Sequence, residues 1–367
     1  MIKRNILDCM TLVGGTPLRF EGEKTYVSTG AVDCDHVDYA QTERVTYDNR
    51  PSRANLSVAE GDILFAKMCG TKKTLRIDRP LSEHLYSTGF CAVRANESLM
   101  DAALLYHLLA SDQFLTQKDQ NSSGATQKAI TNAGLRKIVI QVPDLPEQRK
   151  LAANLDCIEQ MMANRREQLV SFDQLVKSRF IELFGDIVLN PFGWEKDYLG
   201  VVCDVRDGTH DSPHYHSTGF PLVTSKNVTG GEIDLTDCSL ISEADFNKIN
   251  ERSKVDMGDI IMPMIGTVGK PVIVNVKPNF AIKNVSLIKF KDDSRVLNTF
   301  IRSLLQSDYF DDAVLSKVRG GTQKFISLGD IRKLVVIVPP MELQEQFAAF
   351  VEQTDKSKLY GKMEVAA

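Results

Sequence analysis

The sequence predicts an α+β protein made of two similar β-rich globular domains, separated by a long helix with coiled-coil heptads and followed by a second helix. Three observations lead to this prediction. Apolar residues recur with heptad spacing mid-chain, the two halves repeat each other about 196 positions apart, and short apolar segments alternate with turn residues. We expect domains at residues 1–145 and 187–340, the long helix at 146–186 and the second helix at 341–367.

Length and composition agree with two globular domains and a connector. The chain has 367 residues, 43% apolar and 25% charged, and its net charge of −4 neither indicates nor excludes a nucleic-acid partner. No apolar run is long enough to span a membrane, and no apolar segment follows the first five residues as in a signal peptide. The seven cysteines are scattered and never form C-x-x-C, which favours reduced thiols in the cytoplasm and argues against structural zinc.

The first domain reads as short strands, then a helix, then a closing strand. The expected elements are a turn at 13–17, strands at 26–29, 62–67 and 90–94, a helix at 99–115, a loop at 121–125 and a strand at 138–142.

The long helix has clear signals at both ends. Pro146 suits a first turn, Glu147 places negative charge at the positive end of the helix dipole, and Gly185 can adopt a left-handed stop. About 38 residues at 1.5 Å each give a rod of roughly 57 Å. The predicted seam is Leu151, Leu155, Ile158, Met162, Arg165, Leu169, Phe172, Val176, Arg179 and Leu183. This pattern is typical of a helix that lies against a partner helix.

Two arginines, Arg165 and Arg179, interrupt this apolar seam. Charged residues at such positions lower stability, and they can fix the register or leave a place for another chain. The alternative interpretation is a long core helix inside one large domain. We rank it lower because the segments on either side of the helix resemble each other.

The second domain repeats the order of the first. Residues 124–128 match 320–324 and residues 111–114 match 307–310, both at an offset of 196. Its expected elements are turns at 190–195 and 208–213, a strand that runs into a loop over 222–228, strands at 259–264 and 272–276, a glycine turn at 266–269 and a helix at 297–305. The order is conserved along the whole domain, so we infer a tandem duplication. The second helix has only 22 residues after Glu345, whereas the first continues for almost 40 after Glu147.

These features together resemble the specificity subunit of type I restriction-modification systems. The similarity rests on the Pro-Glu-Gln-Arg entry at 146–149, the helix exit at 178–186, the segments 206–213 and 223–227, and the doubled order of domain and helix. It covers nearly the whole chain. The second helix departs from the family pattern because it is short, which leaves open how many partner subunits it can dock.

The resemblance implies a DNA-recognition and scaffold role. Each globular copy would be a target-recognition domain that reads one half of a bipartite site in double-stranded DNA. The helices would pack antiparallel, set the spacing between half-sites and dock methyltransferase (modification) subunits, and restriction subunits would complete the complex. The chain would carry no cofactor and catalyse nothing; S-adenosylmethionine would be on the modification subunit, and ATP and Mg²⁺ on the restriction subunit. A self-dimer through the helices is a further alternative.

Polar and cationic loop residues are the candidates for DNA contact, because base edges and phosphates are read by such side chains. In the first domain they are Lys67, Lys72, Lys73, Arg76, Thr126, Gln127 and Lys128. In the second domain they are Thr209, His210, Ser225, Lys226, Asn227, Lys270, Thr322, Gln323 and Lys324. For any single residue, a plain polar loop retained by duplication is the competing interpretation.

Three other motifs suggest enzyme chemistry and fail on inspection. Residues 266–271 lack the earlier glycine of a phosphate loop and the hydroxyl residue that follows its lysine. The histidines within 210–216 lie around a proline with no cysteine near them, so we predict no metal site. Residues 190–192 match only part of the adenine-methyltransferase tetrad. Two alternatives to the DNA-recognition subunit remain. One is a stand-alone DNA methyltransferase or nuclease, which these motifs do not support, and the other is a helix-mediated scaffold that binds no DNA.

Overall fold

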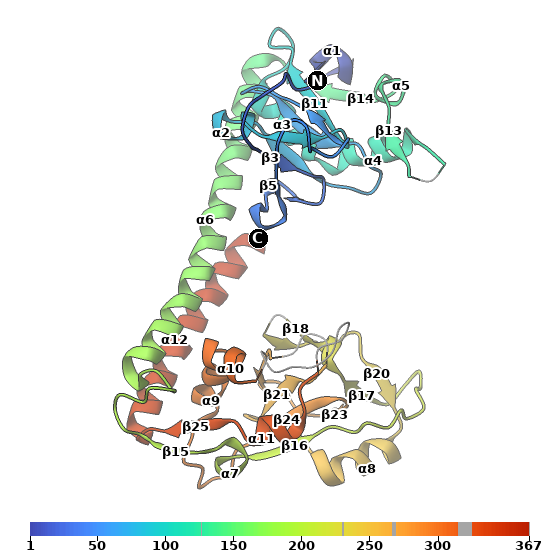
Figure 1. Ribbon diagram of the computed structural model, residues 1–367. Coiled ribbons are helices and arrows are strands. Elements are labelled where there is room, and N and C mark those ends of the chain that lie inside the picture. The colour runs from blue at the N-terminus through green and yellow to red at the C-terminus, as the bar shows by residue number, and fades with distance from the viewer. Residues whose placement is uncertain (126, 230, 266–268, 315–324, 367) are drawn as a thin grey trace. The chain divides into compact units, whose positions relative to one another are not determined.

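The computed structural model describes residues 1–125, 127–229, 231–265, 269–314 and 325–366 (Figure 1). Its contacts divide the chain into two compact units, Met1–Asn164 and Arg165–Ala367, with the division inside the long helix. Each unit mixes helices with small sheets, in agreement with the predicted α+β class. Among the described residues, no helix is both long enough and apolar enough to cross a membrane.

The first unit is built from short strands and short helices. Its elements are β1 (Ile2–Asn5), α1 (Ile6–Cys9), β2 (Met10–Val13), β3 (Lys24–Val27), β4 (Val32–Asp33), β5 (His36–Val37), the 3₁₀ helix η1 (Tyr39–Gln41), β6 (Glu43–Val45), β7 (Ala54–Leu56), β8 (Ile63–Ala66), β9 (Thr74–Arg76), α2 (Arg79–Ser82), β10 (Leu85–Ser87), β11 (Phe90–Ala95), α3 (Ala102–Ala110), α4 (Asp112–Gln120), β12 (Ser122–Ser123), β13 (Ala129–Ile130), α5 (Asn132–Leu135), β14 (Val139–Val142) and the start of α6 (Leu145–Phe184).

Two four-stranded sheets form the body of this unit. One has the order β6-β3-β10-β7 and the other the antiparallel order β2-β11-β8-β9. Strand β1 pairs with β14, so the first and last strands of the domain lie together. Helices α3 and α4 supply leucines and Phe114 to the core, where the Phe114 ring meets the edge of Phe65 on β8. Successive residues of β8 point to opposite faces of the sheet, so Ile63 and Phe65 lie in that core, and Leu64 and Ala66 lie in a second one.

The second unit repeats this construction. Its elements are β15 (Glu195–Tyr198), α7 (Leu199–Val202), β16 (Asp204–Asp207), β17 (Phe220–Val223), η2 (Ser225–Asn227), β18 (Val228–Thr229), β19 (Glu232–Ile233), β20 (Ser239–Ile241), α8 (Glu243–Ser253), β21 (Ile260–Pro263), β22 (Val272–Ile273), β23 (Ala281–Ile282), β24 (Val285–Lys289), α9 (Asn298–Leu305), α10 (Asp308–Ala313), α11 (Leu328–Arg332), β25 (Val335–Val338) and α12 (Met341–Ala366).

The strand order confirms the duplication inferred from the sequence. Strand β15 pairs with β25 as β1 pairs with β14, and the sheet β16-β24-β21-β22 matches β2-β11-β8-β9. Helices α9, α10 and α11 follow in the same places as α3, α4 and α5. The two domains therefore share this central arrangement of strands and helices, and each is followed by a helix. Strand β7 of the first unit and helix α8 of the second have no counterpart among the described residues.

A buried glutamine joins each domain to the helix that follows it. Gln148 of α6 is 1% exposed; its Oε1 accepts a hydrogen bond from Asp101 N at 2.9 Å. Its Nε2 donates to Leu99 O at 3.0 Å and Pro143 O at 2.9 Å. Gln344 of α12, 196 positions later, makes the same three bonds with the second domain. The glutamine is thus a structural joint, because its amide satisfies backbone groups that would otherwise be buried without partners. In the second helix this residue is Gln344, which follows Leu343, and not Gln346 of the Glu-Gln pair at 345–346.

In the second unit, α12 runs antiparallel to the C-terminal half of α6 (Figure 1). The rings of Phe180 and Phe184 both meet Phe347, near the start of α12. Further back on α6, Asp173 accepts from Lys358, further along α12, at 2.7 Å. The order of these contacts fixes the antiparallel direction. Helix α12 has 26 residues within this sequence and α6 has 40.

Helix α6 ends as the sequence predicts. Gly185 has φ +77°, the left-handed stop, and its N–H donates to Ile181 O at 2.8 Å. The indole Nε1 of Trp194 donates to Phe184 O at 2.9 Å. A carbonyl of the last turn, which has no partner within the helix, is satisfied in this way.

One predicted element was wrong. The single helix expected over 99–115 is two helices, α3 and α4, separated at Ser111. Ser111 has an extended backbone, and its Oγ accepts from Phe114 N at 3.3 Å as the N-cap of α4. A serine that caps the second helix ends the first, and the leucine pattern alone does not reveal this break.

Candidate nucleic-acid interface

In the first domain, three of the candidate lysines lie on one loop. Residues 67–73 connect β8 to β9, and we call this segment the lysine loop. Lys72 Nζ lies 3.1 Å from Asp112 Oδ1 in an exposed ion pair, and Lys73 Nζ donates to Thr29 O at 2.8 Å. Among the described residues, Lys67 has no ion-pair partner. The loop turns at Gly70, where φ is +73°.

The structure brings the second group of candidates to the lysine loop. Cys69 N donates to Lys128 O and Ile130 N donates to Lys67 O, both at 2.9 Å. Gln127 and Lys128 are exposed beside the loop. The candidates at 67–73 and at 127–128, far apart in sequence, therefore belong to one surface. Thr126 lies outside the described residues.

Below the lysine loop lies a charged residue that sequence reasoning missed. Lys118 of α4 is 0% exposed, and its Nζ donates to Ala66 O at 3.3 Å, Met68 O at 3.0 Å and Thr71 O at 2.8 Å. Burial lowers the pKa of Lys118, and the neighbouring Asp119 opposes this change. The spacing along the helix could have indicated that Lys118 is buried. Lys118 follows the buried Phe114 by four residues and so lies on the same face of α4.

Arg76 faces helix α6 and is held there. Its guanidinium pairs with Asp156 and lies 4.1 Å from the centre of the Tyr106 ring. His107 Nε2 approaches the same Asp156 oxygen at 2.8 Å. The pKa of Asp156 lies below its usual value, chiefly because the carboxylate accepts from Arg76, and His107 adds to this effect. The prediction that Arg76 contacts DNA remains untested, but this cation already has a partner.

His107, Asp156 and Glu159 are the one group of the described residues whose ligand atoms could hold a metal ion, all within 4.8 Å of one another. Arg76 occupies the same place, with its NH2 3.9 Å from Glu159. A guanidinium between two carboxylates neutralises them, so the cluster is an ion-pair network that fastens α6 to α3 and β9. The histidines at 210, 214 and 216 do not converge with acidic residues into a second such group within the described ranges.

In the second domain, His210 is held between two acceptors on the loop after β16. Its Nδ1 lies 2.9 Å from Asn284 Oδ1 and its Nε2 lies 2.9 Å from Asp207 Oδ2. Hydrogen bonds to Asn284 and then to Asp207 raise the pKa of His210 above its usual value, because the imidazolium can donate to both. Arg252 pairs with the other oxygen of Asp207. The neighbouring Thr209 accepts from Asp211 N at 3.1 Å, which shapes the turn.

The segment 225–227, where the sequence predicts that the strand passes into a loop, is a 3₁₀ turn. Asn227 is 3% exposed, and its Oδ1 accepts from both the N–H and the hydroxyl of Thr224. Its amide is therefore occupied in holding the turn. Ser225 is half-buried, and Lys226 is exposed and paired with Asp237 at 3.3 Å. Of these three candidates, Lys226 presents most surface to a ligand.

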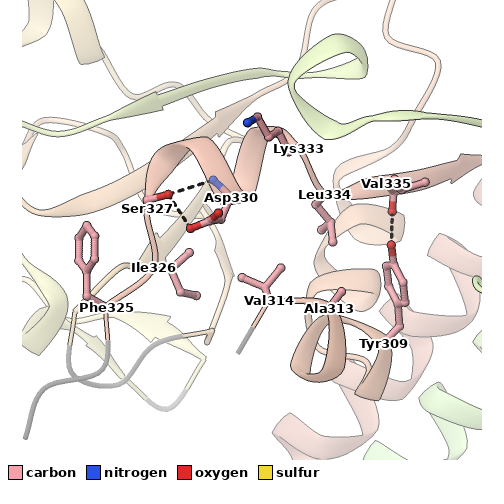
Figure 2. Close-up of a pocket in the computed structure, with 10 residues that line it drawn as sticks. All are labelled: Tyr309, Ala313, Val314, Phe325, Ile326, Ser327, Asp330, Lys333, Leu334 and Val335. Carbon is pink, nitrogen blue, oxygen red and sulfur yellow. Dashed lines mark hydrogen bonds between the residues drawn. The ribbon is translucent and has the colours of Figure 1, made fainter. Parts of the chain in front are cut away.

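The remaining candidates of the second domain lie near undescribed residues. Lys270 is exposed, and most of the glycine turn expected at 266–269 lies outside the described residues. Thr322, Gln323 and Lys324 lie outside the described residues. Figure 2 shows a pocket of about 590 Å³ whose lining includes Val314 and Phe325. Its wall is held by the hydroxyl of Tyr309, which donates to Val335 O at 2.8 Å.

The predicted helix seam divides into two parts. Its second part is half-buried and consists of Arg165, Leu169, Phe172, Val176, Arg179 and Leu183. Its first part is exposed and consists of Leu151, Leu155, Ile158 and Met162. Phe180 and Phe184, which are outside the predicted seam, are the most buried residues near the helix end, because α6 there also packs on Phe300 of the second domain.

Comparison with known proteins identifies the family. A family model described as type I restriction modification DNA specificity domain matches residues 15–170 and 191–362, once in each half. The chain belongs to this family. Specificity subunits are the non-catalytic components of type I complexes, so membership confirms the prediction that this chain is not an enzyme. It also confirms the resemblance found in the sequence and implies DNA target recognition.

Relatives of this specificity family are distant in sequence. The chain is 23% identical over 323 residues to the EcoKI specificity subunit of Escherichia coli, covering 81% of this chain and 68% of that protein. It is 24% identical over 275 residues to the MjaIX specificity subunit of Methanocaldococcus jannaschii, covering 68% and 61%. The chain thus spans about two thirds of these relatives.

Solved structures show the same fold. A type I system S subunit from M. genitalium matches with a TM-score of 0.56 at 16% identity, over 100% of this chain and 92% of that one. A chain from a study of the assembly and conformational transition of a type I system matches with a TM-score of 0.55 at 22% identity, again over 100% and 92%. At these identities the likeness concerns the fold.

Proposed function

We propose that this chain is the recognition subunit of a type I complex, with each domain reading one half of a bipartite DNA site. The observation that carries the proposal is the duplication of the domain together with its buried glutamine joint. Two copies of one reader, each fixed to a helix, suit two separated stretches of DNA, and the helices then set the distance between them.

The surfaces that we assign to DNA follow the candidate residues. In the first domain the lysine loop and the adjoining Gln127 and Lys128 form one cationic, polar surface. In the second domain Thr209, His210, Lys226 and Lys270 supply similar groups. Cations on loops bind phosphates and position the protein, whereas neighbouring amides and hydroxyls can read base edges.

A selection experiment tests this function directly. The chain, purified with its modification subunit, is incubated with random duplexes, and the bound DNA is sequenced. We expect two short blocks of defined sequence separated by a gap of constant length. One block alone, or none, would contradict the two-reader arrangement. Binding should also weaken with salt, with a slope of log affinity against log salt of about −0.9 per phosphate contacted.

We also propose that the exposed part of the α6 seam docks the modification subunits, which carry S-adenosylmethionine; restriction subunits would add the chemistry that needs ATP and Mg²⁺. Leu151, Leu155, Ile158 and Met162 keep the heptad spacing, and Ile158 is 53% exposed. An exposed apolar stripe of this kind suits a partner helix. A second copy of this chain is the alternative occupant.

Size-exclusion chromatography with light scattering tests the docking. Ile158→Asp should abolish the complex with the modification subunit, because a carboxylate would be buried in the seam. Val170→Asp is the matched control, since Val170 is 57% exposed on α6 but outside the seam. Equal effects of the two changes would refute docking at the seam. Complexes of the wild-type chain with one or two modification subunits, or a dimer of the chain, would show what the shorter α12 allows.

The rival functions give different results in the same assays. A stand-alone methyltransferase or nuclease would bind S-adenosylmethionine or cut DNA without any partner subunit. A scaffold that pairs only through its helices would bind mixed duplexes at low salt no better than an unrelated acidic protein does.

A further inference from the structure

We propose that Lys118 is a positioning residue: its buried ammonium group holds the lysine loop in the one conformation with which the first domain reads DNA. The proposal rests on the function proposed above. It concerns a side chain that is 0% exposed and so touches no DNA itself. It acts through the backbone of residues 66–71.

The contacts of Lys118 use the full capacity of its ammonium group. A lysine has three N–H donors, and here they meet three backbone carbonyls, at 3.3 Å from Ala66, 3.0 Å from Met68 and 2.8 Å from Thr71. The three carbonyls lie within six residues of one another in sequence. The loop therefore curves around the ammonium group as around a bound cation.

The residue that follows Lys118 completes the arrangement. Asp119 Oδ2 accepts from Gly70 N at 3.0 Å, and its Oδ1 lies 3.6 Å from Lys118 Nζ. Two successive residues of α4 thus bind the backbone of residues 66–71: Lys118 donates to its carbonyls, and Asp119 accepts from the N–H of Gly70. Gly70 has φ +73°, a conformation that glycine adopts without strain, so the loop can turn at this point.

The same loop holds the other candidates of the surface. Lys67 and Cys69 are hydrogen-bonded to the backbone of residues 128–130, at 2.9 Å in both cases. A change in the curvature of the loop would therefore also move the segment that carries Gln127 and Lys128. A single buried group controls the relative placement of both halves of the proposed contact surface.

Stability alone does not account for a lysine at this position. Burying a cation is costly, and replacing buried charges by apolar side chains of similar size is often neutral or stabilising. Methionine has a similar unbranched shape and no charge to desolvate. What methionine cannot do is donate to three carbonyls, so the loop would lose the group that selects its conformation while the core around α4 would remain filled.

The residue of the second domain that is equivalent to Lys118 is not a lysine. The position 196 residues after Lys118 is Val314, which is buried and apolar. Because the two domains share their central arrangement of strands and helices, the difference predicts that substitution of Lys118 affects the reading of one half-site only. The other half-site and the gap between the two serve as internal controls.

The test compares the wild-type chain with Lys118→Met, each in complex with the modification subunit, by selection from random duplexes. We expect the sequence preference of one block to be lost, with the other block and the gap unchanged. Affinity for the selected site should fall about 10- to 100-fold, the equivalent of one or two misread base pairs. Non-specific affinity should stay close to that of the wild-type complex. The melting temperature should fall modestly, because the carbonyls of Met68 and Thr71 are only partly buried and can bind water once the ammonium group is gone.

Lys72→Met is the matched control, since Lys72 belongs to the same loop but its side chain is 58% exposed. It should reduce the salt dependence by about 0.9 in log–log slope and leave both blocks readable. Lys118→Met should leave the slope unchanged. Two intact blocks with folded Lys118→Met would overturn the proposal, as would an equal loss of specific and non-specific binding.

A second variant tests the proposal in case Lys118→Met does not fold. If Lys118→Met unfolds the first domain, Lys118→Gln retains a neutral donor in the same place and should reduce the sequence preference of the same block to an intermediate degree. An unchanged motif with Lys118→Gln would then overturn the proposal. Absence of a two-block motif with the wild-type complex would instead refute the proposed function, and the role of Lys118 with it.

Discussion

Substituting Gln148 by alanine removes one side chain and three hydrogen bonds at the joint between the first domain and α6. Its amide accepts from Asp101 N and donates to the carbonyls of Leu99 and Pro143, at 2.9, 3.0 and 2.9 Å. The side chain is 1% exposed, so water does not reach these groups in the folded protein. All three backbone groups would lose their partner at once.

The expected loss follows from the number of groups left without a partner. A buried polar group without a hydrogen bond costs about 1–3 kcal/mol, so three give an upper range of roughly 3–9 kcal/mol. The smaller alanine side chain lets water enter and rehydrate part of the site. We therefore expect Gln148→Ala to lower the free energy of unfolding of the first unit by about 3–5 kcal/mol.

Native-state hydrogen exchange on the full chain is the suitable assay, because it reports the unfolding free energy of each unit separately. Gln344→Ala should lower the value for the second unit by a similar amount, since Gln344 is 0% exposed and makes equivalent bonds. Gln160→Ala is the control; its bond to Asn164 is exposed, and its loss should be within about 0.5 kcal/mol. A change below about 1 kcal/mol for Gln148→Ala would refute the view that this glutamine is a joint.

Two further predictions concern charged groups. The raised pKa of His210, caused by Asn284 and Asp207, stabilises the imidazolium. Its contribution to the second unit is full below about pH 6.5 and is lost as the pH rises through the higher folded pKa, so His210→Gln should flatten the pH dependence of hydrogen exchange in β16. Arg76→Ala should cost the first unit about 1 kcal/mol, because the partly exposed pair with Asp156 is screened by solvent. The lowered pKa of Asp156 means that this difference is present above about pH 4 and is lost on further acidification through the folded pKa, which urea denaturation at several pH values would detect.

The sequence was sufficient for the architecture because its signals are periodic and repeated. Heptad spacing located α6, and Gly185 marked its end with the φ of +77° that a left-handed stop requires. The offset of 196 residues predicted two similar domains. These features depend on patterns within one chain segment or between two copies, and both are readable without coordinates.

Residues whose role depends on distant partners were not predictable in the same way. Lys118 reads as a surface lysine, and only the fold brings three carbonyls from residues 66–71 to its ammonium group. Arg76 reads as a basic loop residue, yet it pairs with Asp156, 80 positions away. The break between α3 and α4 depended on the cap made by Ser111, which competes with a continuous leucine pattern.

Because Trp194 contacts the end of α6, its intrinsic fluorescence can report on this part of the protein. The chain has one tryptophan, and its indole N–H bonds to the carbonyl of Phe184 in the last turn. Tryptophan-selective fluorescence therefore observes a single point, where the long helix passes into the second domain, while the first domain contributes no signal. Strain or release at that junction when DNA or a partner subunit binds can be followed in real time without any label.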